Sequence, residues 1–481
     1  MGEVSRGHSS FAVEAGRRPK RLPARALKER GVQSVLSPGT APAKQLQLPF
    51  ARRGEASVGT RGEGAPVESS GLLEQVVERS NLFAALSRVK RNGGSPGIDG
   101  MSVEALPEYL KRRWPEIRES LLSGTYEPQP VRRAEIPKPG GGVRKLGIPT
   151  VLDRFIQQAL LQVLQPVWDR TFSDRSYGFR PGRSAQQAVA QAQRYLGMGC
   201  SWVVDLDLEK FFDRVNHDKL MSRVRERVSD RRVLKLIDRY LKAGALTAEG
   251  FEATPEGTPQ GGPLSPLLAN LLLDGLDKEL ENRGHRFVRY ADDCNIYVRS
   301  ERAGRRVLGS VTRYLERRLK LSVNEAKSAV ARPWRRSFLG FSFTGRRPNR
   351  RTVSAKALVR FKERVRELTQ RTRGRSLFTV VRELREFVLG WDGYFGYAEA
   401  KSVFKEIDSW IRRRLRCYMW KQWGRRQYRE LINRGVSRDL AWNTRKSAHG
   451  PWRLSRSPAL AFALPGGYFD ALGVPRLYQR H

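Results

Sequence analysis

Two adjacent aspartates, Asp292 and Asp293, lie between two short apolar runs in a chain of 481 residues. The runs, residues 287–290 and 294–298, have the aromatic and β-branched bias of strands, which predicts a hairpin with both acids at its turn. Carboxylates at a turn are accessible to hard divalent cations, and two such ions can align an attacking hydroxyl with a leaving pyrophosphate. Aspartates are also common in solvated turns, so the pair alone does not decide between these interpretations.

A third carboxylate occupies a second strand-like segment, residues 201–208. The alternation places three apolar side chains on one face and two acids on the other, namely Val204, Leu206 and Leu208 against Asp205 and Asp207. If this strand lies beside the hairpin, its apolar face packs into the core and its acidic face meets the two aspartates. The sequence therefore predicts a metal site shared by segments about 85 residues apart.

These two segments, in this order, resemble the palm of a reverse transcriptase. Residues 290–293, which read Tyr-Ala-Asp-Asp, match the catalytic box of that family, and residues 201–213 match the block with its first metal-binding aspartate. The resemblance implies catalysis by Asp207, Asp292 and Asp293. It also implies two Mg2+ ions, held by these residues and by Leu208. One ion would lower the pKa of the primer 3′-hydroxyl, and the other would steady the triphosphate and the leaving pyrophosphate.

A further block resembles the fingers of the same family. Residues 134–149 predict a strand, a glycine turn and a returning strand. The helix that follows has a buried stripe of Phe155, Ile156, Ala159, Leu160, Val163 and Leu164, and we expect Pro166 to end it. Arg144 and Arg154 match basic positions that would hold the incoming triphosphate through bidentate contacts. Surface charge is the alternative explanation for either arginine alone.

Residues 172–184 match another block of the fingers. Their mixture of aromatic and basic side chains suits a template strand that must be stacked and neutralised. The expected RNA contacts in this block are Arg180 and Arg183.

Three residues outside the acidic segments match positions next to the nucleotide. Phe212 matches the steric gate that would select dNTPs over rNTPs, although an ordinary core residue is the alternative. Gln260, in a Gly- and Pro-rich turn at 257–266, matches the residue that contacts the nascent base pair. Lys327 could neutralise or protonate departing pyrophosphate, although a solvent-facing lysine is the alternative.

Two local expectations accompany these blocks. Ser265 is expected to cap the apolar helix that follows the Gly- and Pro-rich turn. Residues 338–341, Phe-Leu-Gly-Phe, are expected to form a strand whose glycine lets the primer backbone come close.

The charge of the chain indicates a nucleic-acid partner. Lys and Arg number 90 against 49 Asp and Glu, which gives a formal net charge of +41. Such an excess goes beyond what solubility needs and is favourable mainly against polyphosphate. From residue 346 onward there are 32 Lys and Arg against 11 Asp and Glu, so +21 of the excess lies in the last 136 residues.

The C-terminal part combines helical apolar stripes with runs of arginine. One expected stripe consists of Phe378, Val381, Leu384 and Val388. The arginines expected to face an RNA phosphate backbone are Arg412, Arg413, Arg414, Arg416, Arg425 and Arg426. Residues 389–395 resemble the thumb signature, called domain X, of group II intron maturases, and residues 451–478 resemble the end of the compact bacterial forms. No paired cysteines with histidine follow, so we expect no HNH endonuclease domain.

The blocks span residues 72–478 in family order. The resemblance implies an α+β fold, a right-hand polymerase with fingers, an antiparallel-sheet palm and a helical thumb. The expected domains are a disordered basic tail at 1–70, fingers at 71–195, a catalytic palm at 196–345, a thumb or domain X at 346–440 and a basic C-terminal extension at 441–481. The tail lacks the apolar surface that would offset its ordering entropy. An Arg-rich organelle presequence is the alternative for it.

By this resemblance the protein is a group II intron-encoded RNA-directed DNA polymerase and maturase. It would bind the intron RNA to assist splicing and copy it into DNA during retrohoming. The expected partners are group II intron RNA, an RNA template with a DNA primer, dNTPs and target DNA.

Two alternatives remain open. A reverse transcriptase of another bacterial lineage, such as a retron, diversity-generating or CRISPR-associated enzyme, would share the palm, but the signature at residues 389–395 disfavours it. A binding-only maturase would retain the polymerase blocks as scaffold. Intact Asp207, Asp292 and Asp293 disfavour this second alternative, because clustered carboxylates repel one another unless a metal offsets their charge.

Cysteine usage and hydropathy bear on location. Cys200, Cys294 and Cys417 have no paired spacing, so we expect a reducing compartment with neither a disulfide framework nor a zinc site. No apolar run approaches the roughly 18 to 20 residues of a membrane span. No signal-peptide apolar region follows the start. We therefore expect a cytoplasmic protein without a membrane partner.

Overall fold

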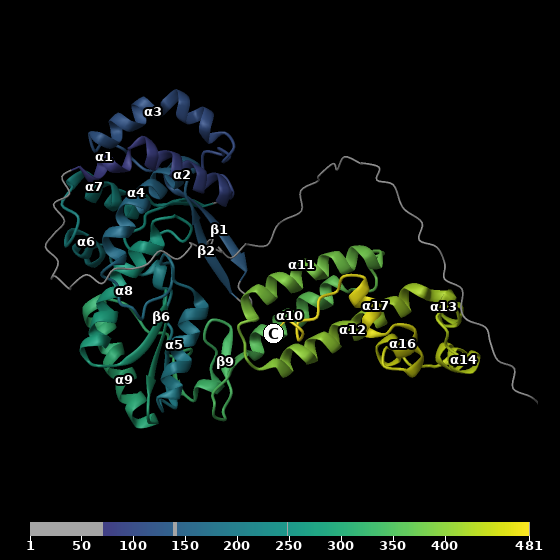
Figure 1. Cartoon of the computed structure of the whole chain (residues 1–481). Coiled ribbons are helices and arrows are strands. Elements are labelled where there is room, and N and C mark those ends of the chain that lie inside the picture. The colour runs from purple at the N-terminus through teal and green to yellow at the C-terminus, as the bar shows by residue number, and fades with distance from the viewer. Residues whose placement is uncertain (1–70, 138–141, 248, 481) are drawn as a thin grey trace, which may run out of the picture. The chain divides into compact units, whose positions relative to one another are not determined.

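The computed structural model describes residues 71–137, 142–247 and 249–480 (Figure 1). The predicted basic tail at 1–70 and most of the predicted glycine turn, residues 138–141, lie outside the described residues. Within the described part of the chain, no helix is long and apolar enough to cross a membrane.

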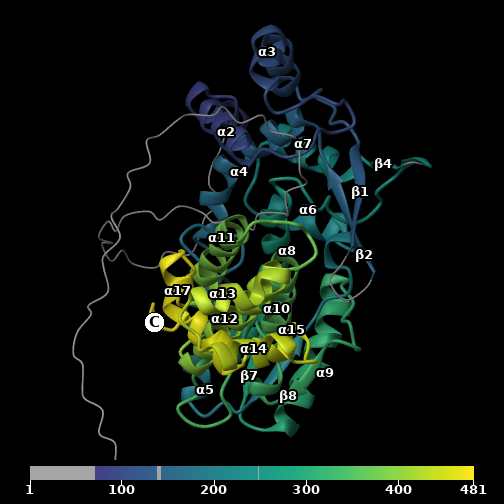
Figure 2. The same ribbon diagram turned by 90° about the vertical axis from the view of Figure 1, so that its right-hand side faces the viewer.

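The N-terminal part contains a four-stranded sheet in the order β2-β1-β4-β5. Strand β1 (Val131–Pro137) pairs antiparallel with β2 (Val143–Ile148), as predicted for residues 134–149. It also pairs parallel with β4 (Ala245–Thr247), which continues into β5 (Gly250–Glu252). Figure 2 shows β1, β2 and β4 beside one another. The helices of this part are α1 (Leu72–Val76), α2 (Arg79–Asn92), α3 (Leu106–Leu122), α4 (Val151–Asp169) and α7 (Arg231–Lys242).

Helix α4 continues past Pro166, where the sequence predicted its end. A proline inside a helix removes a backbone donor and normally breaks the helix. Here Leu164 and Trp168, both 0% exposed, anchor the last turns in the core. Packing therefore outweighs the missing hydrogen bond. The predicted stripe is confirmed for its buried members, Phe155, Ile156, Ala159, Leu160 and Leu164.

The second four-stranded sheet is antiparallel throughout, in the order β6-β7-β3-β8. Its strands are β6 (Arg286–Tyr290), β7 (Asp293–Val298), β3 (Trp202–Leu206) and β8 (Ala329–Ala331). Strand β3 is paired on both sides, as its apolar composition suggests. Three helices pack on this sheet: α5 (Ala185–Gly197), α8 (Ser265–Asn282) and α9 (Glu301–Tyr314) (Figure 1). The expectation of an antiparallel sheet flanked by helices is confirmed.

The two faces of this sheet belong to two hydrophobic cores. Val204 and Leu206 lie in the first core with α8, α9, α4 and α6 (His217–Arg225). Val288 and Tyr297 point to the second core, which also contains α5 and the helices of the C-terminal part. The sheet is therefore buried on both sides, and each side depends on a different set of helices.

The C-terminal part is helical and follows a two-stranded sheet of β9 (Phe341–Phe343) and β10 (Arg351–Val353). Its helices are α10 (Ala355–Leu368), α11 (Leu377–Phe395), α12 (Lys401–Trp423), α13 (Gln427–Asn433), α14 (Arg438–Lys446), α15 (Pro451–Leu454), α16 (Pro458–Ala463) and α17 (Gly466–Ala471). The predicted stripe of α11 is buried at Val381, Leu384 and Val388, but Phe378 is 73% exposed. At 3.6 residues per turn, Phe378 lies roughly 100° around the helix from the centre of the buried stripe. The prediction was wrong for this residue.

Two predicted turns and strands differ in the structure. Ser265 is the first residue of α8, and its hydroxyl donates to the Pro259 carbonyl at 2.8 Å instead of capping the helix. Residues 338–340 form a tight turn, and only Phe341, the first residue of β9, is in a strand. Gly340 has φ +81°, and a Cβ on it would lie 3.0 Å from the ring of Phe395. The glycine therefore makes room for α11, not for a primer.

Candidate active site

The predicted hairpin is present. Strands β6 and β7 pair antiparallel, with Tyr290 opposite Asp293. Ala291 and Asp292 form the turn, and Asp293 is the first residue of β7. Ala291 has φ +56°, a left-handed conformation that costs a non-glycine residue on the order of 1 kcal/mol. The turn therefore depends on support from the residues around it.

Asp207 lies at the same end of the sheet as this turn. Strand β3 pairs with β7 so that Leu206 is opposite Cys294, and Asp207 follows directly. The Asp207 N–H donates to the Ser328 hydroxyl at 3.0 Å, and its carbonyl accepts from the Asn324 N–H at 2.8 Å. The Asp207 carboxylate influences the pKa of both aspartates of the hairpin. Acids from the two predicted segments thus meet, as the spacing of the strands required.

Burial and mutual repulsion raise the carboxyl pKa values at this site. Burial, followed by the charges of Asp292, Asp205 and Asp207, raises the pKa of Asp293 to about 7. Burial also raises the pKa of Asp292; Asp207 adds to that shift and Arg144 opposes it. The carboxylates therefore carry more negative charge than the neighbouring cations offset. A bound cation is favourable under this electrostatic condition.

The donor set fits a hard divalent cation. Carboxylate oxygens are the ligands that Mg2+ takes in proteins. Burial first, and then repulsion from the neighbouring aspartates, raises the pKa of Asp293, and a bound cation would offset both effects. Among the described residues, no three acidic, histidine or cysteine side chains already surround a common metal position. Leu208, the fourth expected metal contact, buries its side chain in the first core, so only its backbone could face an ion.

Asp205 shares the acidic face of β3 but has a cation of its own. Arg336 pairs with the Asp205 carboxylate at 2.6 Å. Burial raises the pKa of Asp205, and Arg336 opposes that shift. Of the two acids on this strand segment, Asp207 is therefore the one with more freedom to take up a metal.

The turn before α8 is held between β2 and the segment that follows β3. The Gly147 N–H of β2 donates to the Gln260 carbonyl at 3.0 Å, and a Cβ on Gly261 would overlap the Gly147 carbonyl. On the other side, the Thr258 N–H donates to the Phe212 carbonyl at 2.7 Å. These backbone contacts join the segment that carries Gln260 to β2 and to the segment that carries Phe212.

Two cations lie within electrostatic reach of the acids. Arg144 is exposed on β2 and lowers the pKa of Asp292. Lys327 Nζ lies 3.4 Å from Asp207 Oδ2, and its side chain is 67% exposed. Lys327 is thus both solvent-facing and an acid partner, so the two alternatives that its sequence position left open are compatible.

Two segments of the chain match models of known protein families. Residues 136–343 match the family model of reverse transcriptase (RNA-dependent DNA polymerase), and residues 358–435 match that of the group II intron maturase-specific domain. The chain contains a reverse transcriptase domain and a maturase-specific domain. The acidic site lies in the reverse transcriptase domain, and the mixed helices and antiparallel sheets are those of the reverse transcriptase fold.

Two curated proteins and one solved structure are similar to parts of this chain. Protein YkfC of Escherichia coli (strain K12) is 38% identical over 219 residues, which are 44% of this chain and 57% of YkfC. Group II intron-encoded protein LtrA of Lactococcus lactis subsp. cremoris is 38% identical over 197 residues, 41% of this chain and 33% of LtrA. The match thus spans just over half of one relative and a third of the other. A chain of the solved partial Cas6-RT-Cas1–Cas2 complex is 27% identical, with 51% of this chain and 42% of that chain covered at a TM-score of 0.34.

Arg154 of α4 supports the loop after α2, which precedes the residues that match the reverse transcriptase model. Its guanidinium donates to the Gly93 carbonyl at 3.2 Å and to the Ser95 carbonyl at 2.7 Å. Burial lowers its pKa. Both Nη atoms of Arg154 thus bind carbonyls of the protein, and its expected contact with the triphosphate stays a prediction. Arg144 is the arginine that stays exposed near the acids.

Arg180, an expected RNA contact, is also structural. It is 4% exposed and donates to the Asp169 carboxylate at 2.8 Å and to the Ser173 carbonyl at 2.6 Å. Arg183 pairs with Asp174 at 2.6 Å, and its side chain is 28% exposed. Of this pair, only Arg183 reaches the surface.

The arginine run on α12 holds the C-terminal segments onto that helix. Arg412 is 6% exposed and pairs with Asp470. The other three arginines contact segments of the same chain that pack beside α12. Arg413 lies 3.7 Å from the centroid of the Trp452 ring. Arg414 donates to the Thr369 hydroxyl at 2.9 Å, and Arg416 donates to the Leu464 carbonyl at 2.9 Å. The expectation that these residues face RNA is corrected for Arg412, which is inaccessible. Arg425 and Arg426, beyond α12, are exposed.

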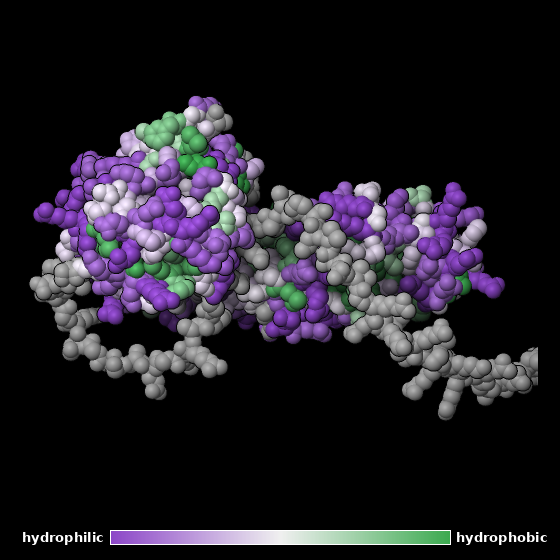
Figure 3. Space-filling view, turned by 90° about the horizontal axis from the view of Figure 1, so that it is seen from above, coloured by the Kyte–Doolittle hydropathy of each residue, from purple (hydrophilic) through white to green (hydrophobic). Residues whose placement is uncertain are grey.

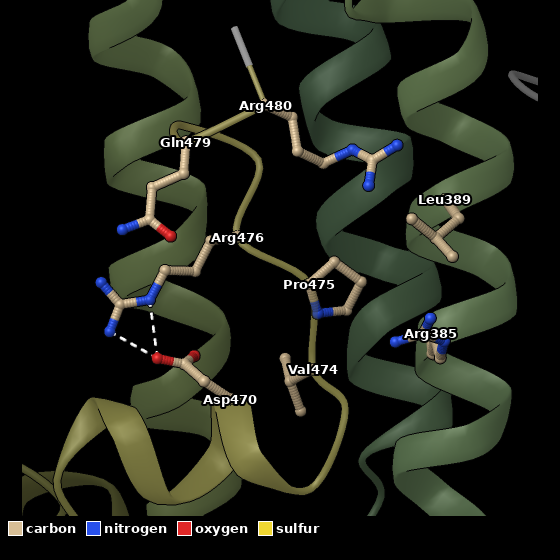
Figure 4. A pocket seen from close by; sticks show the side chains of 8 residues that line it. All are labelled: Arg385, Leu389, Asp470, Val474, Pro475, Arg476, Gln479 and Arg480. Carbon is tan, nitrogen blue, oxygen red and sulfur yellow. Dashed lines mark hydrogen bonds and ion pairs between the residues drawn. The ribbon is translucent and has the colours of Figure 1, made fainter.

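The segment after α17 packs between α11 and α12 around a hollow of about 290 Å³ (Figure 4). Arg476 donates to the Asp470 carboxylate at 2.7 Å, and Arg480 donates to Asp392 at 2.8 Å. The buried Asp408 of α12 accepts from the Leu477 N–H at 3.0 Å and the Tyr478 N–H at 2.9 Å. The guanidinium groups at this hollow therefore have partners within the protein.

Sequence reasoning missed the residues that lie beneath the acidic turn. Arg289, on β6, is 0% exposed and pairs with Asp277 of α8. The sequence did hold one signal, a charged residue in the middle of an otherwise apolar strand, three positions before Asp292. A buried arginine needs a partner, but its identity depends on which helix covers the strand.

Asp274, one turn before Asp277 on α8, predicts a pH effect on stability. Burial, and then the charge of Asp277, raises its pKa to about 6. An acid with a raised folded-state pKa binds a proton on folding between its unfolded value, 3.8, and about pH 6, so stability falls as the pH rises through that window. Asp274→Asn removes this loss. The difference in unfolding free energy between the variant and the wild type should therefore shift in favour of the variant by at most about 3 kcal/mol as the pH rises from about 4 to about 7. Urea unfolding of both proteins at several pH values measures this, and parallel profiles would contradict a raised pKa.

Proposed function

We propose that the protein is an RNA-directed DNA polymerase encoded by a group II intron, which also binds the intron RNA to assist splicing. One observation carries the polymerase part: Asp207, Asp292 and Asp293 converge at one end of a sheet in the reverse transcriptase domain. The maturase part rests on the match of residues 358–435 and on the likeness to an intron-encoded protein. During retrohoming the same chain would copy the intron RNA into DNA at a target DNA.

Two Mg2+ ions held by Asp207, Asp292 and Asp293 would supply activation of the primer 3′-hydroxyl and charge neutralisation at the pyrophosphate. The chain's own residues position the reactants. Arg144 is exposed near Asp292 and can bind the triphosphate of the dNTP through its planar guanidinium. Lys327, the ammonium group 3.4 Å from Asp207, can donate a proton or charge to the departing pyrophosphate.

Assistance to splicing requires no bond chemistry from the protein. The maturase-specific domain would hold the intron RNA by shape and backbone contacts while the RNA cuts and joins itself. Hydrophilic residues cover most of the face drawn in Figure 3. Exposed Arg425 and Arg426, with the excess of +21 from residue 346 onward, supply cations for this purpose. The division into fingers at 71–195, palm at 196–345, thumb at 346–440 and extension at 441–481 follows from the same proposal.

Neither alternative accounts for both halves of the chain. A reverse transcriptase of a retron, diversity-generating or CRISPR-associated lineage has no need of a group II intron maturase-specific domain. A binding-only maturase has no use for clustered carboxylates at a site where burial, and then their mutual repulsion, raises the pKa of Asp293 to about 7.

Discrimination between dNTPs and rNTPs tests both the polymerase activity and the role of Phe212 as a steric gate. Phe212 is half-buried, its ring centroid lies 5.2 Å from that of Phe211, and its carbonyl is bound by Thr258. Its ring is therefore held in place and can exclude a 2′-hydroxyl. The wild type should extend a DNA primer on an RNA template with dNTPs but not with rNTPs. Phe212→Val should accept rNTPs with discrimination reduced by about 10- to 200-fold, the range for a small pocket change.

Single-nucleotide incorporation on one RNA template, with dCTP or CTP, measures this ratio. Phe155→Leu is the control, because Phe155 is 2% exposed and packs in the core against Trp114. Extension with neither nucleotide by the wild type would contradict the polymerase proposal. Unchanged discrimination in Phe212→Val would contradict the role of Phe212 alone.

A further inference from the structure

A buried polar network lies directly behind the turn that carries Asp292. Its centre is Arg289 on β6, which binds Asp277 through two parallel hydrogen bonds: Nε to Oδ1 at 2.7 Å and Nη2 to Oδ2 at 2.6 Å. The side chains of this pair are 1% and 0% exposed. The remaining nitrogen, Nη1, donates to the Ala291 carbonyl at 2.9 Å and to Asn270 Oδ1 at 2.9 Å. One guanidinium thus joins α8 to the backbone of the turn.

Asn270 extends this network to a third segment. Its Nδ2 donates to the Gly178 carbonyl at 2.8 Å. Gly178 lies so close to the turn that a Cβ on it would overlap the backbone nitrogen of Ala291. Beside it, the Tyr177 N–H donates to the Arg289 carbonyl at 2.9 Å. The turn is therefore enclosed by β6, by α8 and by the segment at residues 175–178.

Stability alone does not account for an ion pair at this position. Apolar residues of similar size often replace a buried ion pair without loss of stability, because desolvation cancels most of the attraction. What apolar residues cannot supply is the hydrogen bond to the Ala291 carbonyl. Ala291 is the residue with φ +56° immediately before Asp292, so this bond acts on the strained point of the turn.

The geometry points to Arg289, Asp277 and Asn270 as a positioning clamp for the metal-binding turn. Arg289 fixes the conformation of Ala291 and with it the direction of the two carboxylates that follow. Asp277 and Asn270 orient the guanidinium by accepting hydrogen bonds from its other N–H groups. None of the three touches a substrate, so their effect passes through Asp292 and Asp293. The inference rests on the proposed function for the role of those carboxylates.

The clamp also connects two parts of the active site. Helix α8 begins directly after the turn that holds Gln260, and five residues into the helix it presents Asn270 to Arg289. Displacement of α8 would therefore move the nucleotide contact and the metal-binding turn together. This coupling gives the same helix a part in both binding events.

Replacing the ion pair with apolar residues separates positioning from stability. We expect the double variant Arg289→Met with Asp277→Leu to stay folded at the assay temperature, because it removes both charges and fills their space, although the acceptors that lose Arg289 lower its unfolding midpoint. The turn loses the bond to Ala291 in the same variant. Its kcat for dNTP incorporation should fall about a hundredfold, as for a misplacement of about 1 Å, while KM for the dNTP changes little. Asn270→Ala, which leaves the ion pair in place, is the milder second variant and should give a smaller loss.

Two readouts do not depend on turnover. Hydrogen exchange of the peptide covering residues 286–298 should quicken in the double variant. The affinity for Mn2+ is measured from the electron paramagnetic resonance signal of the unbound ion. It should weaken by about tenfold or more, because the loss of one hydrogen bond changes a free energy by about the amount that corresponds to a tenfold change in affinity. Asp230→Asn is the matched control, because Asp230 is a buried carboxylate paired with Arg232 at 3.1 Å on α7. It should lower stability and leave Mn2+ affinity and kcat unchanged.

The outcomes distinguish the clamp from the proposed function. If the folded double variant binds Mn2+ and turns over like the wild type, the clamp is wrong. If both variants unfold at the assay temperature, the pair is structural and the positioning role is also wrong. If the wild type itself binds no Mn2+ and extends no primer, the proposed function fails, whatever the hydrogen exchange of the turn.

Discussion

Primer extension on an RNA template should disappear in Asp292→Ala, while splicing of the intron RNA in vitro largely survives. Asp292 lies in the turn beside Asp207 and Asp293, and its loss leaves too few carboxylates for two cations. Loss of electrostatic stabilisation of this kind should lower kcat by about a thousandfold or more. Splicing should persist because it depends on RNA binding by the maturase-specific domain and not on this site.

The control for Asp292→Ala is an aspartate of the same domain that has no part in the site. Asp238 pairs with Lys242 at 2.8 Å on the surface of α7, and Asp238→Ala should keep both activities. Circular dichroism and the unfolding midpoint establish that Asp292→Ala is folded. Loss of both activities in a folded Asp292→Ala would contradict the separation of roles. Retained primer extension would refute the assignment of the catalytic carboxylates.

Affinity for intron RNA should fall steeply as salt rises. Each phosphate that a Lys or Arg neutralises releases counterions, so a protein that neutralises 6 to 10 phosphates loses about 10³- to 10⁵-fold in affinity between roughly 50 and 200 mM salt. The excess of +21 from residue 346 onward is large enough to neutralise phosphates in this number. Filter binding with labelled intron RNA at several salt concentrations gives the slope directly.

A pair of double variants locates the surface responsible for this slope. Arg425→Ala with Arg426→Ala should reduce the salt slope by about 2, because each arginine would neutralise one phosphate. Arg305→Ala with Arg306→Ala removes the same charge from exposed positions on α9 and should leave the slope unchanged. A flat salt response of the wild type would show that the basic C-terminal part is not the RNA clamp. Equal effects of the two pairs would show that only net charge matters.

The acidic site could be predicted because its geometry is local and periodic. The turn at Asp292 is fixed by the strand bias on either side, and the alternation of β3 separates Val204 and Leu206 from Asp207. Only one relation, the pairing of β3 with β7, is long-range. That pairing followed from the need of an apolar face to be buried and of acids to share a cation.

The partners of the arginines could not be predicted in the same way. In the sequence Arg412 belongs to a basic run that resembles a solvated face, but Asp470 lies 58 residues further along the chain and pairs with it. Arg180 and Arg154 are engaged by carbonyls of loops whose course no periodicity reveals. The sequence therefore shows how many cationic side chains the protein has, whereas tertiary packing decides which of them remain free to bind RNA.

The continuation of α4 through Pro166 has a similar explanation. Local chemistry favours a helix end at proline, and the burial of Trp168 overrides it. Arg289 is a case in which the sequence shows that a partner is needed but not which residue the partner is. A lone charge in an apolar strand signals a buried partner, but the identity of Asp277 required knowledge of the helix that covers the strand.

The catalytic sheet shares its second core with the C-terminal helices, and this bears on how the protein can be divided. A fragment that stops before α10 would leave Val288, Tyr297 and Phe341 with α5 but without the C-terminal helices that share their core. Such a fragment would expose a contiguous apolar surface and tend to aggregate. Separate expression of the two halves is therefore a poor route to separate activities. The proposed polymerase and splicing roles therefore depend on segments that fold together around one core.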